Sequence, residues 1–503
     1  MTKRTILAID QGTSSTKCLL VDETGAIIAR GISPVGERHP QPGWVEQDSD
    51  EIWRSIREAV QRCLEGQDHR AVLAIGFSTQ RESLLMWERS SGRALSPIVS
   101  WQDQRTAADC DEIRTPQTEI LVRQKSGLPL DPMFSALKAK WLLDCHDSAR
   151  TRARAGEICL GTIDSWILSR FGGAHLIEAG NASRTQLLNV TQVAWDADLL
   201  ALFNIPEACL PRIVSSTGPF PAVSGLAPIP DGVPILGVMG DSHAALFAHG
   251  AFVPGQIKAT YGTGSSVMGL VHKPEALDPG LCLTIAWSID GPVFAAEGNI
   301  RAAGATLRWV SELFAVSTDE LVELAARSSS GDVFLVPGFN GLGAPWWDRK
   351  AVGLLAGFTL GTDRGAIARA ALESIGHQVA DVVEAIDRGV GRVQKVFADG
   401  GITRNSTLMQ FQADLLLRPV LRSHTSELSA LGAAHLAGHK LGIWSQSDLS
   451  ALTRERDMFR CDMAPAQANE ARERWHQAVA RARGMPGGAA QQEKFSVVAG
   501  GRA

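Results

Sequence analysis

The fold of this chain is decided by the stretch Ile6-Leu7-Ala8-Ile9-Asp10-Gln11-Gly12-Thr13-Ser14-Ser15-Thr16-Lys17-Cys18-Leu19-Leu20-Val21. Two short apolar runs flank a turn that is rich in glycine and hydroxyl side chains. A second turn, which contains Gly25, leads into a third apolar run at 26–29. No helical period separates these runs, so the pattern predicts an antiparallel meander of three strands.

The same pattern returns near the start of the second half, about 250 residues later. The strand pattern at 255–261 leads into Gly262-Thr263-Gly264-Ser265-Ser266 and then into the apolar run at 267–271. A repeat at this distance predicts two related domains rather than a solenoid of short repeats. We expect domains at 1–249 and 250–465, followed at 466–503 by a helix and a mobile tail.

Composition excludes several classes of protein. The 503 residues include 49 Lys+Arg and 54 Asp+Glu, which gives a net charge of −5, so neither nucleic acid nor an anionic membrane is the expected partner. No apolar stretch reaches the ~18 residues that a membrane span requires. The first residues lack the pattern of a signal peptide, and the eight cysteines show no zinc-site or disulfide spacing. We therefore expect a cytoplasmic protein.

The two glycine-rich turns are candidates for phosphate binding. Successive backbone N–H groups in such turns bind anions, and the hydroxyls of Thr13, Ser14, Ser15 and Thr263 add further donors. Asp10, at the end of the first strand, could hold Mg²⁺ through its waters. Plain hairpin turns are the alternative interpretation. The chain has no G-x-x-x-x-G-K-[ST] motif, so these turns are not a Walker P-loop.

Two further strand-to-helix junctions could carry chemistry. Asp241 follows the buried-strand pattern at 235–240 and begins a helix, where it could serve as a general base or simply cap the helix. Gly400-Gly401 comes after the strand-like Val396-Phe397 and before a helical pattern that begins at Thr407. A glycine pair there would let the backbone approach a flat ligand such as adenine, although a tight turn alone would also explain it.

Taken together, the ordered motifs resemble those of the FGGY carbohydrate kinases, and within them the glycerol kinases most closely. The resemblance extends from about Ile6 to about Ala451. It is carried by Leu7–Lys17, Gln80-Arg81-Glu82, Trp101–Thr106, Gly127–Ser135, Gly161–Trp166, Asn181–Thr185, Tyr261–Gly264, Gly341–Asp348, Gly400-Gly401 and Leu431–Ala434.

This resemblance implies two actin-like (ribonuclease H-like) α/β domains with ATP bound in the cleft between them. Asp10 would lie near Mg²⁺, and the nucleotide would be held by Thr13, Ser14, Ser15, Lys17, Thr263, Gly304, Gly401 and Asn405. Asp241 would accept the proton of the substrate hydroxyl. Arg81, Glu82 and Trp101 would line the polyol site, although a solvated surface pair is the alternative interpretation of Arg81 and Glu82.

Four positions depart from the glycerol kinase pattern. Met133 replaces a tyrosine, Ser242 a glutamine and Ser266 a phenylalanine, while Arg308 replaces a glutamine on the nucleotide side. Smaller side chains at 242 and 266 vacate volume and remove hydrogen-bond partners around a three-carbon ligand. We therefore expect a roomier pocket, suited to a four- or five-carbon polyol or ketose, with glycerol a poorer substrate.

The expected reaction is transfer of the ATP γ-phosphoryl group to a terminal hydroxyl of a small polyol or sugar. Within this class, glycerol itself and a ketopentose of the xylulose or ribulose type remain open as substrates. An actin-like or chaperone-like ATPase and a catalytically silent regulator are the alternatives outside it. The family likeness also suggests a homodimer.

Overall fold

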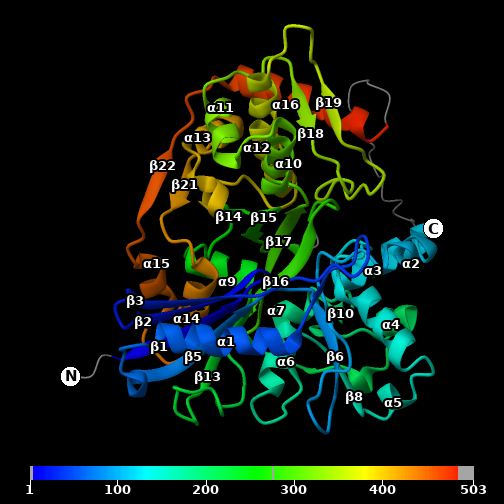
Figure 1. Ribbon diagram of the computed structural model, residues 1–503, viewed down its shortest axis with the longest axis vertical. Coiled ribbons are helices and arrows are strands. Elements are labelled where there is room, and N and C mark those ends of the chain that lie inside the picture. Colours follow the sequence, from blue (N-terminus) through cyan, green and yellow to red (C-terminus); the bar gives the residue numbers. More distant parts are fainter. Residues whose placement is uncertain (1–3, 275–276, 485–503) are drawn as a thin grey trace, which may run out of the picture.

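The computed structural model describes residues 4–274 and 277–484, which form two lobes, each built on a central β-sheet (Figure 1). In Figure 1 the lower lobe is coloured mainly from blue to green, and the upper lobe mainly from green to red. The predicted mobile tail falls almost wholly at 485–503, outside the described residues.

The sheet of the first lobe has the strand order β13-β5-β1-β2-β3. Its strands are β1 (Thr5–Gln11), β2 (Ser15–Asp22), β3 (Ile27–Pro34), β5 (Val72–Thr79) and β13 (Ile235–Gly240). β1 pairs antiparallel with β2, and β2 with β3, which confirms the predicted meander. β5 is parallel to both β1 and β13. The ends of β1, β5 and β13 therefore meet at one edge of the sheet.

Both faces of β1 are buried, which explains its uninterrupted apolar run. Leu7 and Ile9 pack in one core with α1 (Ser49–Cys63), whereas Ile6 and Ala8 pack in another with α14 (Leu428–Lys440). Because successive strand residues point to opposite faces, a strand covered on both sides must be apolar at every position.

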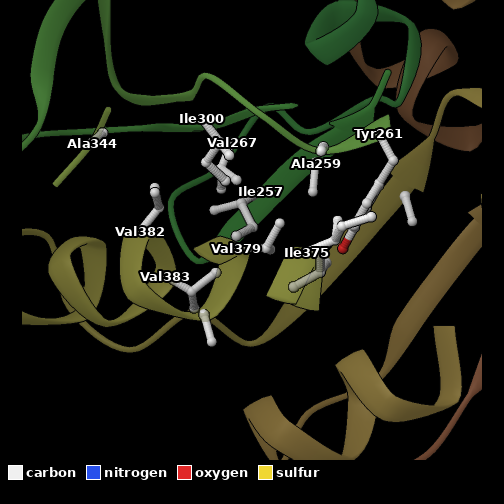
Figure 2. Packing of buried hydrophobic residues seen from close by; sticks show 14 of the residues in the cluster. Ile257, Ala259, Tyr261, Val267, Ile300, Ala344, Ile375, Val379, Val382 and Val383 are labelled. Atoms are coloured by element: carbon white, nitrogen blue, oxygen red, sulfur yellow. The ribbon is translucent and has the colours of Figure 1, made fainter. Parts of the chain in front are cut away.

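The sheet of the second lobe has the order β16-β17-β15-β14-β20-β21-β22. Its strands are β14 (Gln256–Tyr261), β15 (Ser265–Leu270), β16 (Cys282–Ser288), β17 (Pro292–Ile300), β20 (Lys395–Asp399), β21 (Val420–Ser423) and β22 (Arg456–Phe459). β14 and β15 are antiparallel and joined by a short turn, so the strand–turn–strand pattern of the first lobe does recur. Figure 2 shows Ile257, Ala259 and Val267 of this sheet packed against Ile375 and Val379 of α12 (Arg364–Gly389).

The two halves of the chain interlock at α14. This helix lies late in the sequence, yet it packs against β1, β5 and β13 of the first lobe and against α9 (Asp241–Ala248). In Figure 1 the orange helix α14 lies beside the blue strands. α9 in turn contacts β14 and β15 of the second lobe. These two helices therefore join the lobes, and the predicted domain boundary at 249/250 stays a prediction.

The remaining elements cover the two sheets and the outer part of the first lobe. A four-stranded sheet has the order β4-β7-β6-β8, and the other strands form pairs. These strands are β4 (Glu46–Gln47), β6 (Leu84–Glu88), β7 (Ile98–Val99), β8 (Ile158–Thr162), β9 (Leu176–Glu178), β10 (Leu188–Asn189), β11 (Ala194–Trp195), β12 (Arg212–Val214), β18 (Phe334–Val336) and β19 (Leu354–Ala356). The helices are α2 (Ala107–Glu112), α3 (Pro116–Ser126), α4 (Ser135–His146), α5 (Thr151–Arg154), α6 (Ile163–Ser169), α7 (Ala179–Ala182), α8 (Ala197–Phe203), α10 (Gly304–Phe314), α11 (Thr318–Ala326), α13 (Ser406–Leu416), α15 (Gln446–Ala451) and α16 (Pro465–Ala482).

Candidate active site between the lobes

Each of the two glycine-rich turns is closed by a backbone hydrogen bond. In the β1–β2 turn, the Gly12 amide donates to the Ser15 carbonyl at 3.0 Å, and in the β14–β15 turn, the Gly262 amide donates to the Gly264 carbonyl at 2.9 Å. Ser14 and Thr263 are exposed at the tips. Both turns thus present hydroxyl side chains to solvent, although their predicted contacts with phosphate stay predictions.

Asp10 is the penultimate residue of β1, in surroundings that suit a divalent cation. Its carboxylate is almost buried and accepts a hydrogen bond from Ser78 Oγ at 2.8 Å. Burial raises the pKa of Asp10 to about 6, and the nearby Asp241 carboxylate adds to the rise, although Ser78 and Lys17 oppose it. Two carboxylates close enough to repel each other leave excess negative charge, which Mg²⁺ would neutralise.

Asp241 is the first residue of α9, but it does not cap that helix. The N-cap residue is Gly240, which has no side chain to offer. The Asp241 carboxylate instead accepts the Ser242 amide at 2.6 Å and lies 3.2 Å from Arg81 Nε. Burial raises the pKa of Asp241, with Arg81 opposing the rise, and 38% of the side chain stays exposed. A partly exposed carboxylate of raised pKa is suited to accepting a proton.

Arg81 joins the two lobes through a buried ion pair. Its Nη1 and Nη2 donate to Glu297 Oε2 and Oε1 at 2.8 and 2.7 Å, and Glu297, on β17 of the second lobe, is 0% exposed. Such bidentate pairs fix the guanidinium plane. The interpretation of Arg81 and Glu82 as a solvated surface pair was therefore wrong, because both side chains are buried.

A second arginine extends this pair into a network that sequence reasoning missed. Arg184 Nε donates to Glu82 Oε1 at 2.6 Å, and its Nη1 lies 2.9 Å from Glu297 Oε2. Glu82 itself has a φ of 62°, an unusual value for a residue with a side chain. Glu297 could have been found from the sequence, because it is a lone charge in the otherwise apolar and glycine segment at 294–298.

Trp101 and Met133 have different neighbours in the candidate site. Trp101 Nε1 donates to Thr13 Oγ1 at 3.0 Å, which ties the predicted polyol site to the first turn. Met133 is half-buried beside Phe134 in a small apolar cluster. The Arg184 guanidinium lies 5.1 Å from the Phe134 ring centre, so this cluster adjoins the arginine network.

The two serines that depart from the glycerol kinase pattern lie close together. Ser242 Oγ and Ser266 Oγ are 3.3 Å apart. Ser266 also donates to Glu297 Oε1 at 2.8 Å. Lys258 Nζ, on β14, donates to Ser242 Oγ at 3.0 Å and to Ser266 Oγ at 3.4 Å. Lys258 was missed from the sequence, although a lysine in the middle of a buried strand is a recognisable signal.

A cavity of about 840 Å³ opens beside Asp241. It is lined by residues of both lobes: Lys17, Asp241, Ser242, Ala245, Thr260, Asp399, Gly400, Gly401, Thr403, Arg404, Arg422, Ser423, His424, Thr425, Ser426, Glu427, Leu428, Ser429 and Asp457. Gly400 has a φ of 97°, which favours glycine, and a Cβ at Gly401 would meet no atom within 4 Å. A Cβ at Gly400 would lie 2.4 Å from the Tyr261 carbonyl oxygen, so Gly400 is packed against the second turn, and Gly401 alone faces open space, where a flat ligand could approach the backbone.

The other predicted nucleotide residues border the second lobe. Gly304 begins α10, and its amide donates to the Gly262 carbonyl at 3.0 Å, so this helix starts at the second turn. Arg308 is exposed on the same helix. Asn405 caps α13, because its Oδ1 accepts the Leu408 amide at 2.8 Å. The predicted contacts of these residues with a nucleoside stay predictions.

Comparison with known proteins identifies the family. Models of the FGGY family of carbohydrate kinases match this chain over both domains, the N-terminal one at residues 5–248 and the C-terminal one at 257–441. The chain belongs to this family. It is 43% identical over 490 residues to an apulose kinase of Pectobacterium atrosepticum, covering 96% of this chain and 99% of the relative. It is 44% identical over 494 residues to a glycerol kinase of Aromatoleum aromaticum, covering 95% and 99%.

Solved structures agree with this assignment. The glycerol kinase of Plasmodium falciparum with ADP superimposes with a TM-score of 0.88 at 29% identity, covering 95% of this chain and 98% of that one. A ligand-bound xylulose kinase of Lactobacillus acidophilus gives 0.84 at 20% identity, covering 94% and 96%, a likeness of fold alone. The protein is thus an ATP-dependent carbohydrate kinase with the expected pair of actin-like domains. Among its described helices, none combines the length and the apolar character that a membrane crossing demands.

Proposed function

We propose that this kinase phosphorylates a terminal hydroxyl of a four- or five-carbon polyol or ketose, with Asp241 as the base. The observation that carries the proposal is that Asp241, which lines a cavity between the lobes, is held beside the buried Arg81–Glu297 pair. Ser242 lines the same cavity and is hydrogen-bonded to Ser266. Relatives named for apulose and for glycerol are similarly close in sequence, so the identity alone does not choose between these substrates.

Different residues of the chain have different roles in the proposed reaction. Arg81 is held by Glu297, so its Nε can stay beside Asp241 and orient the carboxylate. Asp241 accepts the proton that the substrate hydroxyl loses as it attacks the γ-phosphorus. Thr13 and Thr263, in the two turns, would donate hydrogen bonds to the phosphate oxygens. Positioning and charge neutralisation supply most of the catalysis in such reactions.

The carboxylates of Asp10 and Asp241 fit a Mg²⁺ ion. Each raises the other's electrostatic energy, because like charges repel, and oxygen ligands are those that Mg²⁺ prefers. A bound Mg²⁺ would neutralise the charge of the transferred phosphate. The surrounding residues keep Asp10 in place through Ser78, whose hydroxyl donates to the carboxylate.

The enlarged substrate pocket rests on Ser242 and Ser266. Both hydroxyls are half-buried, and both are hydrogen-bonded to a lysine that lies beneath them. A larger substrate has more oxygen atoms that can pair with such hydroxyls than glycerol has. Ser242 and Ser266 stand where glycerol kinases carry the larger glutamine and phenylalanine, so a three-carbon ligand would leave part of the pocket unfilled, and glycerol should bind and react less well.

The test is ADP release with Mg-ATP and a panel of glycerol, tetritols, pentitols, ketopentoses and a blank without sugar. We expect faster release on a larger substrate than on glycerol.

Asp241→Asn should lower turnover by ~10²–10⁴-fold while ATP binding stays close to normal, because general-base catalysis contributes that much. The exposed Asp319→Asn is the control. Glycerol as the best substrate would refute the larger pocket, and near-normal turnover of Asp241→Asn would refute the assigned base.

A further inference from the structure

A row of three polar residues, at and just beyond the end of β17, contacts the first lobe. Glu297, Asn299 and Arg301 lie two positions apart, and alternate residues of a strand point to the same side. Glu297 binds Arg81 and Arg184 of the first lobe. Asn299 Oδ1 accepts a hydrogen bond from Arg184 Nη2 at 3.1 Å. Arg301 directly follows β17 and makes the third contact of this row with the first lobe.

Arg301 binds Asp131 in a largely buried ion pair. Its Nη2 donates to Asp131 Oδ2 at 2.5 Å, and only 20% of the Arg301 side chain and 4% of the Asp131 side chain are exposed. Its Nη1 donates to the Asn340 carbonyl oxygen at 2.7 Å. A guanidinium that donates to two groups is fixed in its plane, and its bond to a carboxylate is charge-assisted. The pair therefore joins residue 131 of the first lobe to residues 301 and 340 of the second.

Asp131 uses its other carboxylate oxygen to hold the backbone of Met133. Asp131 Oδ1 accepts the Met133 amide at 3.0 Å, while Oδ2 accepts the guanidinium. Two residues further along, Ser135 Oγ donates to the Glu82 carbonyl at 2.9 Å. The 131–135 segment thus extends from the ion pair to the backbone of Glu82. Met133 and Glu82 are both residues that the sequence predicts in the substrate site, so the ion pair is bonded to a wall of that site.

We propose that Arg301 is a positioning residue for the substrate, because its ion pair with Asp131 holds the 131–135 segment in place against the second lobe. Arg301 acts through Asp131, and the segment presents Met133 to the substrate. Without the pair, the buried Asp131 carboxylate loses the cation bound to it, and the segment can shift. Small displacements of the groups that position a substrate are costly to its reaction. The inference rests on the proposed function, because it places the substrate between this segment and Asp241.

The experiment measures KM and kcat of the full-length enzyme for ATP and for the best substrate of the panel of glycerol, tetritols, pentitols and ketopentoses. Arg301→Gln removes the positive charge. We expect the KM for the substrate to rise roughly tenfold, the effect of about one hydrogen bond to a charged group. The KM for ATP should stay within about twofold, because the ion pair does not contact the glycine-rich turns. Arg301→Lys keeps the charge and should restore part of the loss.

The matched control is a second ion pair between the lobes. Arg349 Nη1 lies 3.0 Å from Asp111 Oδ1, but the Asp111 side chain is 62% exposed. Asp111 belongs to α2, which carries none of the residues predicted in the substrate site. Arg349→Gln therefore removes a contact between the lobes without releasing the 131–135 segment. Its KM for the substrate should stay close to the wild-type value.

A double-mutant cycle tests whether Arg301 acts through Asp131. Asp131→Asn removes the charge but keeps an oxygen that can accept the Met133 amide. If both residues act as one pair, the double variant should be no worse than the more affected single variant, because a pair can be broken only once. If Arg301→Gln does not fold, Arg301→Lys and Asp131→Asn, which weaken the same pair, replace it.

The results distinguish a positioning role from a general loss of contacts. A rise in the KM for the substrate alone, restored in part by Arg301→Lys and absent in Arg349→Gln, supports the inference. An unchanged KM, an equal rise in Arg349→Gln or in the KM for ATP, or additive effects in the cycle overturns it. The proposed function then still stands, because the wild-type enzyme phosphorylates its substrate. A wild-type enzyme that releases no more ADP with any compound of the panel than with the blank overturns the proposed function and the inference together.

Discussion

At the scale of single residues, Glu297 holds the site together. One fully buried carboxylate receives the guanidinium groups of Arg81 and Arg184 and the hydroxyl of Ser266. Although burial opposes it, the two arginines hold the pKa of Glu297 well below its usual range. The carboxylate therefore stays charged, and its charge balances one of the two cations that converge on it.

Replacing Glu297 with glutamine should destabilise the protein. Glu297→Gln keeps the size of the side chain but leaves Arg81 and Arg184 without the carboxylate between them, and breaking a buried pair in this way costs about 3–5 kcal/mol. The measurement is the free energy of unfolding by denaturant, with the exposed Glu312→Gln as control. A loss below about 1 kcal/mol would show that the two arginines find other partners and that Glu297 is dispensable.

At the scale of elements, α14 and α9 place the base. A Cβ at Gly432 of α14 would lie 1.9 Å from the backbone oxygen of Ala244 in α9. The two helices therefore touch at a point where only glycine fits. Because α9 begins at Asp241, any change in this packing moves the proposed base relative to Arg81.

Gly432→Ala should therefore damage both stability and catalysis. Forcing a methyl group into a closed contact typically costs about 1–3 kcal/mol, and the separation here is at the severe end of such contacts. We expect that loss in denaturant unfolding, together with a lower kcat. Lys440→Ala, on an exposed position of the same helix, should stay within about 0.5 kcal/mol of the wild type. A fully active, fully stable Gly432→Ala would contradict this packing.

A second pair of elements, α12 and α16, is joined by a charged cluster. Arg472 of α16 bonds Asp381 and Glu384 of α12, and His476 lies 3.2 Å from Asp381 and 3.5 Å from Glu384. Asp381, Glu384 and His476 have a spacing that could hold a metal ion, and among the described residues no other group of three has it. The Arg472 guanidinium already contacts all three.

This cluster predicts a pH dependence of stability. Burial lowers the pKa of His476, but hydrogen bonds to Asp381 and Glu384 outweigh it and raise the value to about 9. Because the folded pKa lies above the ordinary 6.5, the stabilisation is complete below about pH 6.5 and is lost as pH rises through about 9. His476 is partly solvated, so we expect about 1 kcal/mol or less.

The check is to compare the unfolding free energy of the wild type and of His476→Gln at pH 6 and at pH 9.5. The advantage of the wild type should shrink between the two values. The exposed His146→Gln should show no such change. An advantage that is constant or grows with pH would mean that the histidine is not held in its charged form.

The sequence predicted local structure well and long-range partners poorly. The meander at 6–29, the repeated turn and the helix start at Asp241 follow from apolar period and turn residues, which act over a few positions. Arg184 and Glu297 could not be joined to Arg81 in this way, because strands far apart in the chain bring them together. A lone charge in an apolar strand predicts a buried charged residue, but it does not predict which residue forms the ion pair with it.

At the scale of the whole molecule, the two lobes meet through several polar contacts that surround the site. Besides Arg81 and Glu297, Arg301 of the second lobe lies 2.5 Å from Asp131 of the first. Arg123 donates to the Leu281 carbonyl at 3.0 Å. These contacts, with α9 and α14, bring Lys17, the proposed base Asp241 and the glycine pair to one cavity. That arrangement is why a kinase acting between two lobes is the function best supported.

The central claim is tested most directly by competition in one vessel. Wild-type enzyme, limiting Mg-ATP, and equal concentrations of glycerol, xylulose and xylitol are mixed, and the phosphorylated products are quantified by mass. The ratio of products equals the ratio of kcat/KM values, so substrate choice is read without separate rate constants. We predict that the two phosphorylated five-carbon products together exceed phosphorylated glycerol. Phosphorylated glycerol as the main product would contradict the account.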